Sequence, residues 1–233
     1  RVGSNMSLLE VMSSLEAGRN EANRLGMARF GIVVEKAYGV SIKDVRYMAR
    51  QIGMDHGLAV ELWMTEVHEA RILATIVDDP SIVERQQMES WAGDFYSWDL
   101  CDQCCSNLFV RTKYARDVIP DWCGDEREFV RRAGFVMMAA LAVKDKNAPL
   151  ESFLPYIDLM RERSTDQRNN VRKAVNWAIR QIGKRSLAGR EMVMPLAEEL
   201  SVSKDRTARW IGKDAVRELN DPKILHHLQE KQV

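Results

Sequence analysis

The sequence lacks the features that mark several large classes of protein. Its 233 residues include only 6 prolines and 13 glycines, and its Lys and Arg residues equal its Asp and Glu residues at 34 each. It has no apolar run of the roughly 18 residues that a membrane-spanning helix needs. It also has no signal-peptide pattern at its N-terminus. The composition is that of an ordinary soluble protein without a membrane-spanning helix, and we expect a cytoplasmic protein.

The opening letters RVGSNM follow no structural pattern. We interpret residues 1–6 as a possible expression remnant and expect a single folded domain over residues 7–233. A chain of this length buries a substantial core without help from a metal or a disulfide.

Cysteine is scarce, and three of the four cysteines lie close together at Cys101, Cys104 and Cys105, with Cys123 apart. A C-x-x-C spacing occurs in redox pairs and in zinc sites. A zinc site needs a second pair of ligands, and the four histidines do not supply one at a recognisable spacing. A redox pair of the thioredoxin type follows a strand, and none is visible. We therefore interpret the cysteines as reduced core residues and expect no metal and no cofactor.

The overall neutrality hides a basic middle. Residues 111–190 hold 17 Lys and Arg against 10 Asp and Glu, whereas residues 1–110 hold 10 against 16. A solvated helical face produces such an excess, and so does a surface that binds nucleic acid.

Helical periodicity dominates the chain, and the alternation typical of strands is almost absent. The pattern predicts helices at 7–17, 20–37, 41–53, 56–65, 68–78, 81–95, 98–111, 114–122, 126–144, 150–163, 167–184, 188–200, 204–219 and 222–231.

Three segments also resemble one another. "VRYMARQIG" at 45–53, "VRRAGFVMMAAL" at 130–141 and "VRKAVNWAIRQIG" at 171–183 share Val-Arg followed by small and apolar residues. The spacing between the second and third copies, about 40 residues, is typical of HEAT-type helix pairs. The sequence therefore predicts an all-α fold, a HEAT-like α-solenoid of antiparallel helix pairs with a concave face, in preference to a helical bundle.

The helix beginning at Trp98 carries polar residues at its start. At 100° per residue, its apolar face holds the cysteines and Leu108, while Trp98 and Asp102 share one edge of that face. One interpretation is a groove-lining pair. The other is a carboxylate that complements the helix dipole, beside a tryptophan at the core edge.

Two further helices place polar or aromatic residues unexpectedly. In the helix from 126, Arg132 lies beside the core stripe and needs a partner, whereas Arg131 points toward solvent. In the helix from 168, Trp177 lies off the core stripe among Lys173, Arg180 and Lys184. An aromatic ring among cations suits DNA backbone contact, although another helix of the solenoid could equally cover it.

At these helices the sequence resembles the AlkD-like DNA alkylation repair glycosylases, which have HEAT-like repeats. The likeness covers nearly the whole chain, through "MARFGIVVEKAYGVS", "HEARILATIV", "YSWDLCDQ", "FVRRAGFVMMAALAV" and "NVRKAVNWAIRQIGKR". The resemblance implies that Trp98, Asp102, Arg132 and Trp177 are catalytic and line a concave DNA-binding cleft. Phe30 stands where the family pattern has tyrosine, so the hydroxyl group is missing.

The resemblance further implies hydrolysis of the N-glycosidic bond of positively charged N3- or N7-alkylated purines. Asp102 would stabilise the cationic sugar and place a water molecule, and Arg132 would keep Asp102 ionised. It implies contact through the DNA backbone, without flipping of the base into a pocket, and no deep pocket is evident from the sequence. We expect a monomer that binds double-stranded DNA containing alkylated bases, through Phe30, Arg131, Arg168, Lys173, Arg180 and Lys184.

Two alternatives remain open at this point. A non-catalytic HEAT-repeat scaffold that binds DNA or a protein would use Asp102 and Arg132 as a buried structural pair. The segment "LAEELSVSKDRTARWIGKDA" at 196–215 also imitates a helix-turn-helix, although its charges are balanced.

Overall fold

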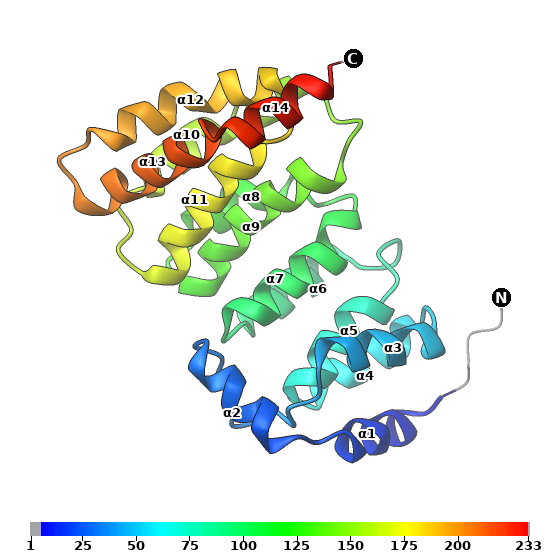
Figure 1. Cartoon of the computed structure of the whole chain (residues 1–233). Coiled ribbons are helices and arrows are strands. Elements are labelled where there is room, and N and C mark those ends of the chain that lie inside the picture. The colour runs from blue at the N-terminus through cyan, green and yellow to red at the C-terminus, as the bar shows by residue number, and fades with distance from the viewer. Residues whose placement is uncertain (1–5, 233) are drawn as a thin grey trace. The chain divides into compact units, whose positions relative to one another are not determined.

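The computed structural model describes residues 6–232, so all of the possible remnant at residues 1–6 except Met6 lies outside the described residues. Within residues 6–232 the chain forms helices and no strands (Figure 1). It divides into two compact units, one ending at Tyr114 and the other beginning at Ala115. The first unit contains the helices α1 (Leu8–Ala17), α2 (Glu21–Arg29), α3 (Ile42–Ile52), α4 (His56–Met64), α5 (His68–Val77), α6 (Arg85–Gly93) and α7 (Trp98–Asn107), followed by the 3₁₀ turn η1 (Phe109–Arg111).

The second unit continues with helices alone. It contains α8 (Val118–Gly124), α9 (Glu128–Lys144), η2 (Leu150–Phe153), α10 (Tyr156–Arg163), α11 (Asn169–Gly183), α12 (Leu187–Ser201), α13 (Arg206–Leu219) and α14 (Pro222–Glu230). A helix overlaps every predicted range in the described residues, and nine of the fourteen have both ends within two residues of the prediction. The predictions at 20–37, 81–95, 98–111, 114–122 and 150–163 were wrong by four residues or more at one end.

Local capping explains where several helices begin. Ser7 and Glu10 form a reciprocal capping box at α1, and the side chains of Asn20, Ser41 and Asp55 accept backbone N–H groups at the starts of α2, α3 and α4. Such caps satisfy N–H groups that have no partner within the helix.

The prediction of one helix over 20–37 was too long. Helix α2 ends at Arg29, and Gly31 has a φ of 76°, in the left-handed region that ends helices. The segment from Gly31 to α3 is irregular, and a side chain of α2 forms hydrogen bonds to its backbone. The side chain of Arg24 donates to the carbonyl oxygens of Val34 and Ala37 at 3.0 and 3.2 Å.

Each unit has a central helix that is buried on nearly all sides. In the first unit α5 has nine buried residues and packs against α3, α4 and α7. In the second unit α9 is buried continuously from Val130 to Ala142 and packs against α8 and α11. A helix that is buried all round forms the core of its unit, and its flanking helices cover it.

The segment proposed as a helix-turn-helix forms the end of α12, a short turn and most of α13. Figure 1 shows these two helices side by side and running in opposite directions. Gly212 of α13 lies so close to α12 that an added Cβ atom would be 2.2 Å from the amide nitrogen of Ser201. The segment is thus a tight antiparallel hairpin, whereas the two helices of a DNA-binding helix-turn-helix cross at a wide angle.

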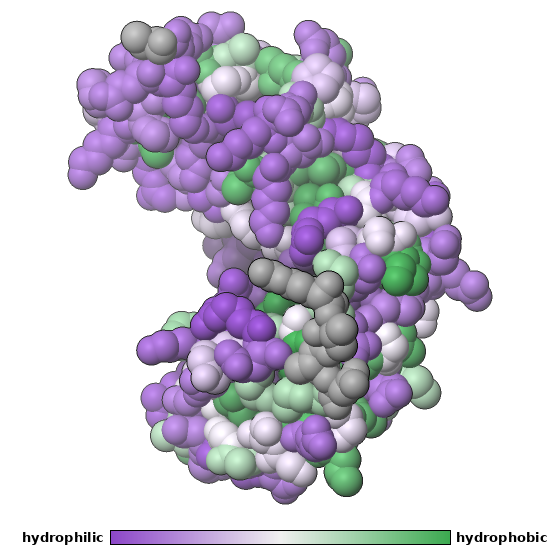
Figure 2. Space-filling view, turned by 90° about the vertical axis from the view of Figure 1, so that its right-hand side faces the viewer, coloured by the Kyte–Doolittle hydropathy of each residue, from purple (hydrophilic) through white to green (hydrophobic). Residues whose placement is uncertain are grey.

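The surface is largely polar. Figure 2 shows hydrophilic side chains over most of one face, with apolar side chains gathered in small patches. Within residues 6–232 no helix has both the length and the apolar character needed to cross a bilayer.

Candidate DNA-binding and catalytic residues

The first unit contains a cavity of about 490 Å³ that is open to solvent on one side. Three helices and the start of α3 supply its walls: Ala22, Asn23, Gly26 and Met27 of α2, with Phe30 after it; Ile32; Val40, Ser41 and Ile42; His68, Glu69 and Ile72 of α5; and Trp98, Asp99, Asp102 and Gln103 of α7. This cavity was not evident from the sequence. The sequence pattern shows which face of each helix is apolar, but it does not show where two helices stand apart.

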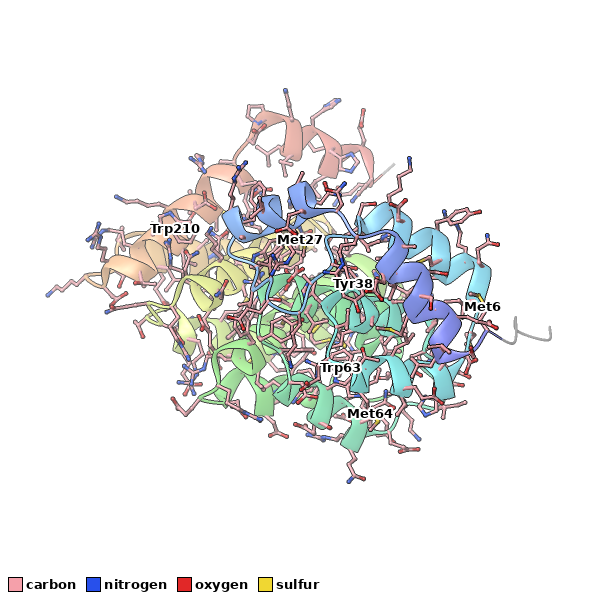
Figure 3. All side chains as sticks on the ribbon, turned by 90° about the horizontal axis from the view of Figure 1, so that it is seen from below. Met6, Met27, Tyr38, Trp63, Met64 and Trp210 are labelled. Carbon is pink, nitrogen blue, oxygen red and sulfur yellow. The ribbon has the colours of Figure 1, made fainter. Side chains whose placement is uncertain are left out.

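The cavity exists because α2 does not pack closely against the core. Helix α2 has no buried residue, and the face it turns to the cavity carries Ala22, Gly26 and Met27, the last of which is labelled in Figure 3. Small residues on this face leave space that larger side chains would fill. The result is an apolar groove under one exposed helix.

Trp98 ties α7 to the end of α2. Its indole N–H donates a hydrogen bond of 2.9 Å to the carbonyl oxygen of Phe30. Phe30 is 75% exposed, and its backbone is what accepts the hydrogen bond from α7. Phe30, Trp98 and Asp102 all line the cavity, and Asp102 is partly exposed there. The sequence thus predicted three residues that the fold brings together.

A hydrogen-bonded histidine fixes the start of α7. His68 is completely buried, with its Nε2 atom 2.6 Å from Oδ2 of Asp99 and its Nδ1 atom 2.6 Å from the Tyr96 hydroxyl. The Ser97 hydroxyl donates to the other oxygen of Asp99. We call His68, Tyr96, Ser97 and Asp99 the His68 network.

The electrostatics of this network keep Asp99 ionised. Burial alone would raise the pKa of Asp99, but the hydrogen bond and charge of His68, together with the Ser97 hydroxyl, outweigh it and lower that pKa. Burial also raises the pKa of Tyr96. Asp99 is therefore committed to its neighbours, and Asp102, which follows it on α7, lines the same cavity.

Glu69 fixes the part of the cavity wall that precedes α3. Its side chain is 1% exposed, and its carboxylate oxygens accept the backbone N–H groups of Tyr38, Gly39 and Val40 at 2.8, 2.7 and 3.0 Å. Charge-assisted bonds to backbone N–H groups are among the stronger hydrogen bonds in proteins. They fix the entry to α3 against α5.

Arg132 and Arg131 of the second unit are both buried, at 7% and 6% exposure. Arg132 donates to the carbonyl oxygen of Asn170 at 2.6 Å, so the prediction of a buried arginine is confirmed. The prediction that Arg131 points to solvent was wrong. Arg131 forms an ion pair of 2.8 Å with Asp166 and donates to the carbonyl oxygen of Asp125.

The prediction for Arg131 was wrong because it considered only the helix that carries this residue. The helical wheel of α9 alone turns Arg131 outward, but the segments before α9 and before α11 fold over it. Arg168 donates to the same Asp166 at 2.7 Å and to the carbonyl oxygen of Glu126 at 3.0 Å. Burial would raise the pKa of Asp166, but the hydrogen bonds from Arg168 and Arg131 lower it to about 2. We call these three residues the Asp166 cluster.

Helix α11 confirms its predicted core stripe. Val171, Ala174, Val175, Ala178 and Ile182 are all fully buried. Trp177 lies off this stripe and is half-buried, and Lys173 is exposed.

Two cations at the C-terminal end of α11 are engaged within the protein. Arg180 and Lys184 each lie 2.6 Å from a carboxylate oxygen of Glu218 on α13. Arg180 also donates to Oδ1 of Asn176. Their charges are therefore largely balanced within the second unit.

The model of a family described as DNA alkylation repair enzyme matches residues 11–219. The chain belongs to the DNA alkylation repair enzyme family. No curated protein matches the chain.

One solved structure is similar over most of its length to this member of the DNA alkylation repair enzyme family. It is described as "a new family of proteins related to the HEAT-like repeat DNA glycosylases with affinity for branched DNA structures". The TM-score is 0.76 at 22% identity, covering 91% of this chain and 95% of that chain. The predicted all-α HEAT-like repeat fold is confirmed. The basic cleft, the roles of the site residues and the single domain stay predictions.

Two residues that line the cavity, His68 and Glu69, were not predicted as site residues. The sequence of this family member nonetheless indicated that they are unusual. His68 and Glu69 stand at the start of "HEARILATIV", a helix in which nearly every position is buried. Charged and polar residues are rarely fully buried unless they are paired. Two such residues on a buried helix therefore predict partners on neighbouring segments.

The cysteines and possible metal ligands can also be placed. All four cysteines are free and buried. Among residues 6–232 no three His, Cys, Asp or Glu side chains are grouped to bind a metal ion.

Proposed function

We propose that this protein is a monofunctional DNA glycosylase that hydrolyses the N-glycosidic bond of cationic N3- or N7-alkylated purines. One observation supports this beyond the family: Trp98 and Asp102, four residues apart on α7, line the same cavity of the first unit. An aromatic face and an accessible carboxylate are the groups that a cationic sugar and base would meet.

The chemistry needs little from the protein, because an alkylated purine already carries a positive charge and leaves readily. The bond between C1′ of the deoxyribose and the purine nitrogen breaks, and the bonding electrons go to the base. Asp102 stabilises the positive charge that develops on the sugar and orients a water molecule toward C1′. The water oxygen bonds to C1′ and its proton passes to the carboxylate or to solvent. Free base and an abasic site result, and no cofactor is required.

The His68 network supplies the rigidity that this role requires. Catalytic groups act best when their supporting residues hold them in place before the substrate arrives. His68 and Asp99 lock the first turn of α7, which carries Trp98, and Asp102 follows one turn later. The roles implied for Arg132 and Trp177, which belong to the second unit, stay part of this proposal.

Release of free N7-methylguanine from alkylated duplex DNA tests the proposal. Asp102→Asn keeps the shape of the side chain but loses its charge, and single-turnover excision should fall by a factor on the order of a hundred or more. The unfolding midpoint of the same variant should change little. A destabilised variant that excises at the parental rate would show that Asp102 is structural. Wild-type protein that releases no base at all would reject the glycosylase.

The second candidate is a DNA-binding protein that does not excise bases. Two observations favour it. Phe30 lacks the hydroxyl that the family pattern has at this position, and the similar solved structure is described as having affinity for branched DNA. Binding to a four-way junction, compared with a duplex of the same arm sequence, tests it. A strong preference for the junction in the absence of any excision would favour this candidate.

A further inference from the structure

Trp210 of the second unit is a large aromatic residue that the fold leaves in contact with solvent. It lies on α13, in the segment that the sequence suggested as a helix-turn-helix, and it is 37% exposed (Figure 3). The core positions Ala208, Ile211 and Ala215 of the same helix are buried, and Trp210 lies away from them around the helix. Tryptophan is highly buried on average, so this ring is available to a ligand.

Arg172 of α11 stacks on this ring. Its guanidinium carbon lies 4.4 Å from the centre of the Trp210 ring, which is a cation–π contact between the two helices. The same guanidinium donates from Nε and Nη2 to the side-chain oxygen of Asn169, at 3.1 and 2.8 Å. Both of these partners are neutral. Among the described residues no carboxylate forms an ion pair with Arg172, so its positive charge is not balanced.

Further positive charges surround the ring. Arg206 stands four positions before Trp210 and Lys213 three positions after it, so these side chains share one face of α13. Both cations are exposed, and so is Lys173, which follows Arg172 on α11. Within the part of the chain that the structure describes, none of these three cations forms an ion pair with a carboxylate.

The acidic residues of α13 and its cap are bonded to other groups. Asp205 accepts the backbone N–H of Ala208 at 2.8 Å. Asp214 and Glu218 each form ion pairs with cations other than those around Trp210. The surface around Trp210 therefore keeps an excess of positive charge, which attracts phosphate groups.

The ring is also held in position before any ligand arrives. The buried side chain of Asn176 on α11 donates from Nδ2 to the carbonyl oxygen of Ile211 at 3.1 Å, directly beside Trp210 in the chain. Gly212 lies against α12 on the other side of α13. A ring on a helix fixed from two sides loses little entropy when it contacts a ligand.

We propose that Trp210 and the cations around it bind an unpaired segment of DNA. One base stacks on the exposed part of the indole, and the adjacent phosphates contact Arg172, Arg206 and Lys213. Aromatic rings among cations bind single strands without regard to sequence. In a duplex the neighbouring bases cover both faces of each base, so an exposed ring favours a strand whose bases are free. Membership of the DNA alkylation repair enzyme family favours DNA over an acidic protein as the partner.

The binding of short labelled oligonucleotides to the full chain tests the role of the ring. Fluorescence anisotropy compares a strand of about eight thymidines with an abasic strand of the same length, which has the phosphates but no bases. We expect the thymidine strand to bind about fivefold more tightly or better, and Trp210→Leu to remove this difference. Trp210→Phe keeps a ring and should retain part of it. Circular dichroism verifies that each variant folds.

Removal of single charges tests the role of the cations. Arg206→Gln and Lys213→Gln should each weaken the binding of both strands and reduce the salt dependence by about 0.7 unit of slope, the value for one phosphate contact on a single strand. Lys43→Gln is the matched control. Lys43 is an exposed lysine on α3 of the first unit, and its replacement changes the net charge by the same amount. This variant should bind both strands as the parent does.

Several outcomes would overturn the inference. One is equal binding of the thymidine and abasic strands by the parent, and another is a loss in Trp210→Leu no greater than in Lys43→Gln. A loss of affinity for a blunt duplex as large as that for the thymidine strand in Trp210→Leu would overturn the choice of unpaired DNA. Binding of a glutamate-rich peptide as tightly as the thymidine strand would show that the surface recognises charge alone. None of these measurements follows excision, so their result is independent of the glycosylase.

Discussion

Trp98 and Phe30 are joined by a hydrogen bond from the indole N–H to the backbone carbonyl, across 68 positions of sequence. It links α7, which is anchored in the core, to the end of α2, which has no buried residue. Together with the hydrogen bonds from Arg24 to Val34 and Ala37, this bond limits how freely the helix moves over the cavity.

Removing the indole N–H should loosen α2 without unfolding the unit. In Trp98→Phe the backbone amides of residues 23–30 should exchange with solvent about tenfold faster than in the parent, while the amides of α5 should be unchanged. Hydrogen exchange followed by mass spectrometry measures both. Phe30→Leu is the control, because it keeps the carbonyl acceptor and should leave the exchange of α2 as it was. Equal exchange in Trp98→Phe and the parent would show that α2 is held by other contacts.

The His68 network should contribute strongly to stability. His68→Leu leaves Asp99 as a largely buried carboxylate without its main partner, and we expect a loss of about 3–4 kcal/mol in the free energy of unfolding. Tyr96→Phe removes only one hydrogen bond and should cost about 1 kcal/mol. Urea denaturation of the three proteins measures the difference. Similar losses in both variants would contradict the assignment of His68 as the partner that keeps Asp99 charged.

The Asp166 cluster predicts a defined loss of stability in acid. The pKa of Asp166 is lowered from 3.8 to about 2 in the folded protein, so the folded state favours the ionised form. Its contribution to stability is present in full above the unfolded pKa and disappears as the pH falls from about 4 to about 2. Thermal unfolding across this range should show a steeper decline for the parent than for Asp166→Asn. Parallel curves would mean that Asp166 does not titrate in this window.

Lys173 and Arg180, two cations of α11, should differ in how their replacement by alanine affects stability. Lys173 is exposed, so Lys173→Ala should weaken binding to any duplex and reduce the salt dependence by about one unit of slope, with no change in stability. Arg180 is bonded to Glu218 and Asn176, so Arg180→Ala should lower the unfolding midpoint as well. Binding at two salt concentrations and thermal melts distinguish them. Unchanged DNA affinity in Lys173→Ala would place the DNA on another face.

Two glycines should respond in opposite ways to alanine. Gly212→Ala places a Cβ atom 2.2 Å from the Ser201 nitrogen and 2.6 Å from the Ala197 oxygen, and it should cost about 3 kcal/mol because α12 and α13 must move apart. Gly26→Ala meets open space and should slow amide exchange within α2, because alanine favours the helix by roughly 0.5–1 kcal/mol. Denaturation and hydrogen exchange measure the two effects. A destabilised Gly26→Ala variant would mean that the cavity is closed in solution.

The helices could be predicted well because their signals are local. Caps such as Ser7 and Ser41, and the stripe from Val171 to Ile182, are visible in a window of a few residues. Tertiary relationships were visible only where a residue was out of place within its own helix, as Trp98, Asp102 and Arg132 were.

What could not be predicted depends on segments far apart in the sequence. The burial of Arg131 comes from Asp166, which lies 35 positions away, and no property of α9 reveals it. The cavity depends on how far α2 stands from α7, which is set by the irregular segment after Gly31 and by the bonds of Glu69 to its end. Periodicity reports the face of a helix, but not its distance from a neighbour.

The burial of the four cysteines affects how readily alkylating agents can modify the protein itself. Electrophiles that methylate purines in DNA also methylate thiolates, and a protein of this family is needed when such compounds are present. Burial raises the pKa of Cys104 and Cys123, so that these thiols stay protonated, and all four sulfurs are shielded from solvent. Protonated, enclosed thiols are poor nucleophiles. The chain therefore offers little thiolate to the reagents whose damage to DNA it is proposed to repair.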